Sequence, residues 1–82
     1  MASTIYPIPL AELVTGEHAT VRSFTAGRAV INRMASLGIT PGAQVDMTQN
    51  YGRGPLIVIV RGTRVALGRG EAAQIFVERS TE

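Results

Sequence analysis

The sequence predicts a mainly β domain, a small barrel of about five short strands with one inserted α-helix. Residues 56–60 carry the strongest strand signal, because they are apolar throughout and mostly β-branched. Apolar residues at helical spacing occur in one stretch, residues 28–37, which Gly38 ends. Several short strands in so short a chain favour a closed or half-closed barrel, because closure removes exposed strand edges.

The first part of the chain is expected to run from a loose leader into a strand. We assign residues 1–8 to the leader, 9–78 to the domain and 79–82 to a C-terminal tail. Pro9 suits the first position of a helical turn that ends near residue 16. Residues 18–25 are a candidate strand, with Ala19 and Val21 on one face and Phe24 on the other, which allows a bulge.

The predicted helix covers about residues 28–37. Val30, Met34 and Leu37 stand at i, i+4 and i+7, so they share one face of the helix. Gly38 can adopt a left-handed conformation, and Ile39 can fold back onto Met34 as in a Schellman cap. Residues 40–43, Thr-Pro-Gly-Ala, then match a type II turn, so a short helix is expected to lead directly into a strand.

The second half of the chain predicts four further strands and one helical turn. Val45 and Met47 alternate with polar residues, as in a half-buried strand, and a glycine-rich loop follows at residues 50–54. Residues 56–60 require cover on both faces, with the helix as the candidate cover for the outer one. Expected next are a hairpin turn at 61–64, a strand at 65–67, a helical turn at 68–74 and a last strand at 75–78.

Composition narrows the function classes. The chain of 82 residues fits one domain, and the absence of Cys excludes disulfides and thiolate metal sites. No apolar run approaches membrane-spanning length, and the N-terminus lacks a signal-peptide pattern, so we expect a cytoplasmic protein without direct membrane insertion. The eight basic residues are all Arg and are scattered without interleaved aromatic residues, which argues against nucleic-acid binding despite the net charge of +2.

The sequence offers little support for a catalytic site, so it does not predict an enzyme. His18 is the sole histidine, and we expect an exposed residue at a strand end rather than a metal ligand. The acidic residues show no spacing typical of a dyad, and one histidine gives little basis for a hydrolytic triad. Residues 51–55 lack the lysine of a phosphate-binding loop and lead into a strand. We therefore predict no catalytic residue, no cofactor and no metal site.

Several motifs of the chain form one ordered pattern. The first half contains Pro9-Leu10-x-x-Leu13, Gly16 and then Arg33-Met34-x-x-Leu37-Gly38-Ile39-x-Pro41-Gly42. The second half contains Gly54-Pro55-Leu56-x-Val58-x-Val60-x-Gly62, Val65-Ala66-Leu67 and Glu71-Ala72-Ala73-x-Ile75-x-Val77. Each motif is a packing or turn signal, and their order and spacing over residues 9–78 resemble a known family, the FeoA-like domain of ferrous iron transport protein A.

The resemblance implies an SH3-like β-barrel with a helix after the first strand. It also implies a partner, the cytoplasmic GTPase domain of the membrane ferrous iron transporter, which family members assist or regulate without catalysis. The same module forms the C-terminal domain of metal-dependent repressors, so the alternative is a metal-responsive regulatory domain that senses a divalent ion through His18 and carboxylates. The chain has no room for a helix-turn-helix, which favours the transport accessory; a weak homo-oligomer stays open.

Two exposed features are the candidate partner-binding residues. One is the polar side of the helix, with Arg28, Asn32 and Arg33, and the other is the loop tip, with Tyr51 and Arg53. Tyr and Arg are enriched at interface hot spots because each covers a large area and also forms hydrogen bonds. The alternative is that Tyr51 packs on the barrel and that Arg53 is only solvated.

Overall fold

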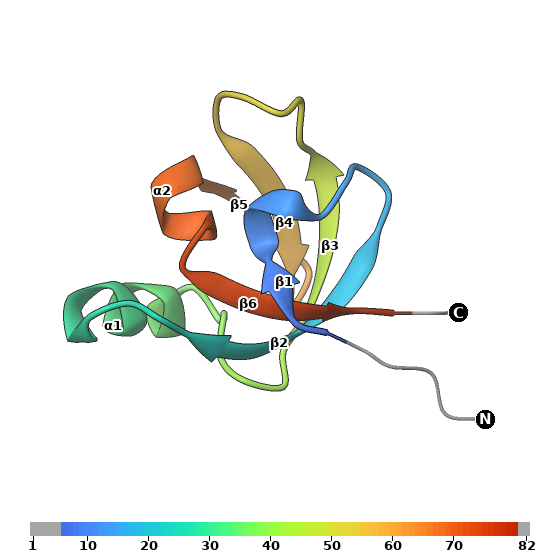
Figure 1. Cartoon of the computed structure of the whole chain (residues 1–82). Coiled ribbons are helices and arrows are strands. Elements are labelled where there is room, and N and C mark those ends of the chain that lie inside the picture. Colours follow the sequence, from blue (N-terminus) through green and yellow to red (C-terminus); the bar gives the residue numbers. More distant parts are fainter. Residues whose placement is uncertain (1–5, 81–82) are drawn as a thin grey trace.

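A computed structural model describes residues 6–80, which form one six-stranded antiparallel sheet in the order β1-β6-β2-β3-β4-β5 (Figure 1). The mainly β fold with one inserted helix is therefore confirmed, although the sheet does not close, since β1 and β5 each have one neighbour. The elements are β1 (Ile8–Pro9), the 3₁₀ helix η1 (Leu10–Glu12), β2 (His18–Phe24), α1 (Arg28–Ser36), β3 (Gln44–Gln49), β4 (Leu56–Val60), β5 (Thr63–Leu67), α2 (Arg69–Ala72) and β6 (Ile75–Arg79).

Strand β1 raises the number of strands above the predicted five. Ile8 lies opposite Val77 and Pro9 opposite Phe76, on the outer side of β6. Pro9 thus ends a strand and precedes η1, whereas the sequence analysis placed Pro9 at the first position of the helical turn. A strand of two residues is too short to show alternation, so it could be found only through its pairing with the other end of the chain.

The predicted bulge in the first long strand is confirmed. The register between β2 and β6 shifts between Val21 and Ser23. Ala19 and Val21 are buried in the core, and Phe24 is partly buried against it. The bulge changes the direction of β2 just before the chain enters α1.

The helix ends as predicted. Gly38 has a φ of 89°, and the backbone N–H of Ile39 donates to the carbonyl of Met34 at 2.9 Å, the long hydrogen bond of a Schellman motif. Ile39 is fully buried. The following turn is also confirmed, because the N–H of Ala43 donates to the carbonyl of Thr40 at 2.9 Å and Gly42 has a φ of 93°.

Strand β4 buries one face in the core and leaves the other partly open. Leu56, Val58 and Val60 are fully buried, whereas Ile57 and Ile59 are half-buried on the opposite face. Helix α1 does not cover that outer face, contrary to expectation; it projects from the side of the molecule (Figure 1). Met34 of α1 is instead buried in the core, and Val30 packs partly buried against it.

The turn between β4 and β5 is tighter than predicted. Arg61 and Gly62 have φ values of 52° and 77°, and Val60 pairs directly with Thr63. Two central residues with positive φ define the hairpin turn that matches the twist of the flanking strands. Strand β5 consequently begins at Thr63, two residues earlier than the alternation indicated.

One hydrophobic core joins all the long strands with η1 and α1. No side-chain nitrogen or oxygen is buried without a hydrogen-bond partner in the described part of the chain. The fully buried large side chains are Leu10, Leu13, Val21, Met34, Ile39, Val45, Met47, Leu56, Val58, Val60, Leu67, Ile75 and Val77.

Among residues 6–80 no helix has both the length and the apolar character needed to cross a membrane.

Candidate partner-binding site

The loop between β3 and β4, residues 50–55, carries Tyr51 and Arg53 at the top of the molecule in Figure 1. Both side chains are exposed, and Tyr51 is 73% exposed, so it does not pack on the sheet. Neither forms a hydrogen bond or an ion pair with another described residue. The loop tip therefore presents an aromatic ring and a guanidinium group that are both available to a partner.

Asn50 fixes the start of this loop. Its Nδ2 group donates to the carbonyls of Ala11 at 2.9 Å and Leu13 at 2.7 Å, in the segment around η1. Its own backbone N–H donates to Oγ1 of Thr15 at 2.9 Å, and its Oδ1 accepts from the N–H of Gly52 at 3.0 Å. One side chain thus joins two segments that are nearly 40 residues apart in sequence.

Arg69 at the start of α2 completes the network. Its Nη2 donates to Oδ1 of Asn50 at 3.0 Å and to the carbonyl of Ala11 at 3.2 Å. Its Nη1 donates to the carbonyl of Gly54 at 3.1 Å, so both ends of the loop are held. Sequence reasoning missed Asn50 and Arg69, because their acceptors are mostly backbone carbonyls, which leave no residue pattern.

Helix α1 presents the other predicted group. Arg28, Asn32 and Arg33 are exposed, and Met34 is the helix's one fully buried residue. Nε of Arg33 lies 2.7 Å from Oε2 of Glu71 in α2. The hydrogen bond from Arg33 is the main reason that the pKa of Glu71 is lowered, and burial partly opposes it.

The structure does not join the two predicted groups into one patch. Figure 1 shows the β3–β4 loop at the top and α1 at the lower left, with α2 at the side between them. Both groups are nevertheless tied to α2, the loop through Arg69 and the helix through Glu71. They are two exposed surfaces fixed to one short helix.

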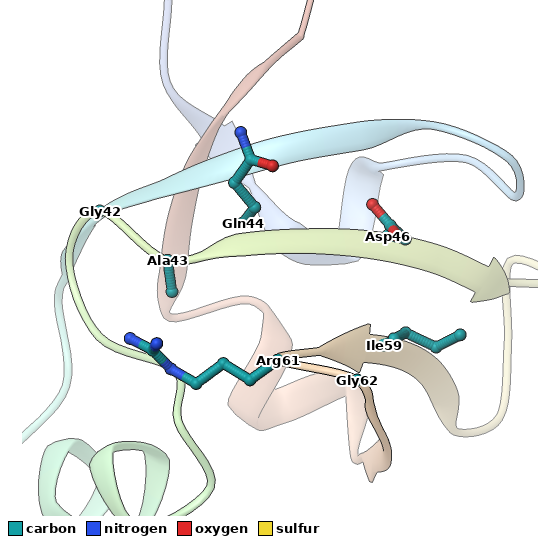
Figure 2. Close-up of a pocket in the computed structure, with 7 residues that line it drawn as sticks. All are labelled: Gly42, Ala43, Gln44, Asp46, Ile59, Arg61 and Gly62. Carbon is teal, nitrogen blue, oxygen red and sulfur yellow. The ribbon is translucent and has the colours of Figure 1, made fainter.

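A polar hollow of about 390 Å³, not foreseen from the sequence, lies beside the β4–β5 turn (Figure 2). Arg61 extends along it, and its Nε donates to the carbonyl of Gly38 at 3.3 Å. This contact joins the hairpin turn to the end of α1. The hollow is lined by Gly42, Ala43, Gln44, Asp46, Ile59, Arg61 and Gly62.

His18 lies at the start of β2 and is exposed, as predicted. It is directly opposite Asp46 on β3, with 2.7 Å between its Nδ1 and Oδ1 of Asp46. Residues 6–80 contain no cluster of three or more His, Asp or Glu side chains that could hold a metal ion. The pair would thus supply only two ligands, and a bound ion would need the others from water or from another molecule.

These features define a small β domain that exposes polar and aromatic side chains on a loop and a helix, both tied to α2 by hydrogen bonds. The FeoA domain family matches residues 8–79. A curated relative from Methanocaldococcus jannaschii, provisionally named Fe(2+) transport protein A, is 37% identical over 70 residues, covering 85% of this chain and 84% of the relative. The chain belongs to the FeoA family, whose members are non-enzymatic accessory proteins of ferrous iron transport. The family resemblance and the expectation of a non-enzyme are thereby confirmed.

Solved structures agree with this assignment. A crystal structure of the iron uptake regulatory protein FeoA is 31% identical, with a TM-score of 0.87 over 92% of this chain and all of that one. Stenotrophomonas maltophilia FeoA complexed with zinc, described as a procaryotic SH3 domain protein, is 32% identical, with a TM-score of 0.72 and coverage of 92% and 89%. The SH3-like prediction is thus confirmed. A manganese-dependent transcriptional repressor shares the fold with a TM-score of 0.84 at 22% sequence identity. The match covers 98% of this chain and 45% of the repressor.

Proposed function

We propose that this protein is a cytoplasmic accessory of ferrous iron transport that binds the GTPase domain of the membrane ferrous iron transporter. Membership of the FeoA family supports the role in transport. The observation that carries the binding proposal is the β3–β4 loop, which exposes Tyr51 and Arg53 on a base held by Asn50 and Arg69.

A fixed loop suits binding for an energetic reason. Ordering a flexible segment on association costs free energy, and a loop already held in one conformation avoids most of that cost. Tyr and Arg side chains contribute disproportionately at interfaces, since they combine a large contact area with hydrogen bonding. The exposed Tyr51 and Arg53 therefore have the chemistry of an interface centre and the support that makes it effective.

The test is the double variant Tyr51→Ala with Arg53→Ala, measured for binding to the purified GTPase domain. We expect an unchanged melting temperature and an affinity lower by about 1–3 kcal/mol, because exposed side chains contribute little to folding. Tyr6→Ala is the matched control, since Tyr6 is 72% exposed but lies outside the loop. If the folded double variant binds the domain and supports iron uptake like the wild type, the loop is only a connector.

The α1 surface is tested separately with Arg28→Ala and Asn32→Ala. Both residues are exposed and stand at i and i+4, so they share one side of the helix. Arg33 is left unchanged in this variant because its ion pair with Glu71 also holds α1 to α2. A loss of affinity comparable to that of the loop variant would extend the interface to the helix, and no loss would limit it to the loop.

The alternative function is a metal-responsive regulatory domain. The observation that favours it is the pairing of His18 with Asp46 at 2.7 Å, which brings two potential ligands together on the sheet surface. Titration with Mn²⁺, followed by the paramagnetic broadening of the His18 ring signals, tests it. If Mn²⁺ broadens signals of β2 and β3 in the wild type but not in His18→Ala, this candidate is supported. If the signals stay sharp throughout the titration, it is excluded.

A further inference from the structure

Strand β5 is a free edge of the sheet. It is the last strand in the order, and among the described residues it pairs only with β4, with Thr63 opposite Val60, and Val65 opposite Val58. In a hairpin with a two-residue turn, the residues flanking the turn exchange both hydrogen bonds, and this pattern repeats at every second residue. The backbone N–H and C=O groups of Arg64 and Ala66 therefore point away from β4.

No described residue satisfies these outward-pointing groups. Among residues 6–80, no hydrogen bond from a loop or a side chain reaches the backbone of Arg64 or Ala66. Both residues are exposed, whereas Val65 and Leu67 turn into the core. The strand contains no proline and no bulge, two of the features that usually block an edge from pairing with another strand.

The charge on this strand selects the kind of partner. Arg64 is exposed and forms no ion pair within the described part of the chain. Most of the acidic side chains described are engaged: Glu17 with Arg79, Asp46 with His18, Glu71 with Arg33 and Glu78 with Arg22. The β5 edge consequently carries a guanidinium group that has no ion-pair partner among the described residues.

A second copy of the chain is a poor occupant of this edge. Antiparallel pairing of two β5 strands about Val65 would place Arg64 of each copy opposite Ala66 of the other. The two Arg64 side chains would then be diagonal neighbours on one face, where like charges oppose association. An extended segment with acidic side chains avoids this repulsion and uses the same backbone groups.

We propose that the β5 edge binds an extended acidic segment of a partner protein, which adds to the sheet as a further strand. Its backbone bonds to the N–H and C=O groups of Arg64 and Ala66, and its carboxylates lie beside Arg64. This surface is separate from the β3–β4 loop and does not depend on the binding role of Tyr51 and Arg53. A negative binding result at one surface therefore does not count against the proposal for the other surface.

The probe is a short synthetic peptide of alternating valine and glutamate, compared with one of alternating valine and lysine. Amide hydrogen exchange by NMR reads out the contact residue by residue. We expect the glutamate peptide to slow exchange at Arg64 and Ala66 by at least about tenfold. The amide of Val65, which already bonds to β4, is expected to stay unchanged, and the lysine peptide is expected to have no effect.

Two variants separate backbone pairing from charge. Ala66→Pro removes an N–H that points away from β4, so the fold is expected to survive while peptide binding is lost. Arg64→Glu is expected to reverse the preference toward the lysine peptide. If Ala66→Pro fails to fold, the reversal in Arg64→Glu and the wild-type exchange data decide the question.

Two results would overturn the proposal. One is unchanged exchange at Arg64 and Ala66 with the glutamate peptide at millimolar concentration. The other is protection of the same amides that rises with protein concentration in the absence of peptide, which would show that two copies of the chain pair through β5.

Discussion

The β3–β4 loop and helix α1 both stand out from the sheet, but different interactions hold them. Asn50 and Arg69 join the loop to the segment around η1 and to α2 by directional hydrogen bonds. Helix α1 relies on one fully buried side chain, Met34, on its terminal turn and on the ion pair of Arg33. The loop is thus positioned by polar contacts that specify geometry, and the helix mainly by burial.

The largest effect is expected at the apolar anchor of the helix. Met34→Ala should lower the free energy of unfolding by about 2–5 kcal/mol, because it removes a fully buried side chain and leaves a cavity. Urea denaturation measures the change, with Ile31→Ala as the control, since Ile31 is 37% exposed on the same helix. Equal losses for the two variants would show that burial does not distinguish the anchor from the rest of α1.

A smaller loss is expected at the centre of the loop network. Asn50→Ala should cost about 1–3 kcal/mol, since it leaves the partly buried carbonyl of Leu13 without its donor and removes one of the two donors to the carbonyl of Ala11. Thermal unfolding and amide exchange at Gly52 measure the effect, and Gln44→Ala, an exposed change on the preceding strand β3, is the control. If exchange at Gly52 stays slow, the hydrogen bond from its N–H to Asn50 does not hold the loop.

The end of α1 comes next. Gly38→Ala should destabilise the protein by about 1 kcal/mol, because a Cβ at a φ of 89° is strained. The added atom would also lie 3.0 Å from Cδ of Arg61, which must move. Gly38→Asn should melt higher than Gly38→Ala, as asparagine tolerates positive φ better. A melt of Gly38→Ala identical to that of the wild type would contradict the role of the cap.

The ion pair between α1 and α2 should contribute least among the helix contacts. Arg33→Ala is expected to cost no more than about 0.5 kcal/mol near neutral pH, because the pair is largely solvated. The lowered pKa of Glu71 means that its ionised form favours the folded state. Its contribution is therefore complete above the unfolded pKa and is lost as the pH falls through the lowered folded pKa. Urea denaturation of the wild type and of Arg33→Ala at neutral and acidic pH measures the effect. The difference in their free energies of unfolding should vanish at acidic pH.

Neither region is expected to depend on metal. The described residues form no cluster that could act as a closed structural site, so a chelator should leave the melting temperature unchanged. Differential scanning calorimetry with and without chelator checks this directly. A decrease of several degrees would reveal a stabilising ion.

Local patterns predicted the helix and its end well. The periodicity of Val30, Met34 and Leu37, the glycine at position 38 and the Pro-Gly turn all depend on neighbours within a few residues. The strand alternation was equally local, and it correctly placed Val45 and Met47 in the core. The exposed positions of Arg28 and Asn32 followed from the helical spacing of the apolar residues, whereas the sequence left open whether Tyr51 packs on the barrel.

The parts that escaped prediction all join distant segments. Strand β1 forms only through pairing with β6, where Ile8 lies opposite Val77. The loop geometry depends on hydrogen bonds from Arg69 to the carbonyls of Gly54 and Ala11, which are far from it in sequence. The sequence also could not show that α1 would leave the outer face of β4 uncovered, because helix placement depends on how the sheet curls.

By itself, the sequence determined that Met34, Val45 and Met47 are buried, where the helix ends and which family the chain resembles. These properties follow from short-range sterics and from apolar spacing, which each segment carries alone. Only the tertiary structure decided that Asn50 and Arg69 support the loop, that the two candidate surfaces are separate and that β5 is a free edge. Those outcomes depend on strand order and on backbone hydrogen bonds, which form only when remote parts of the chain meet.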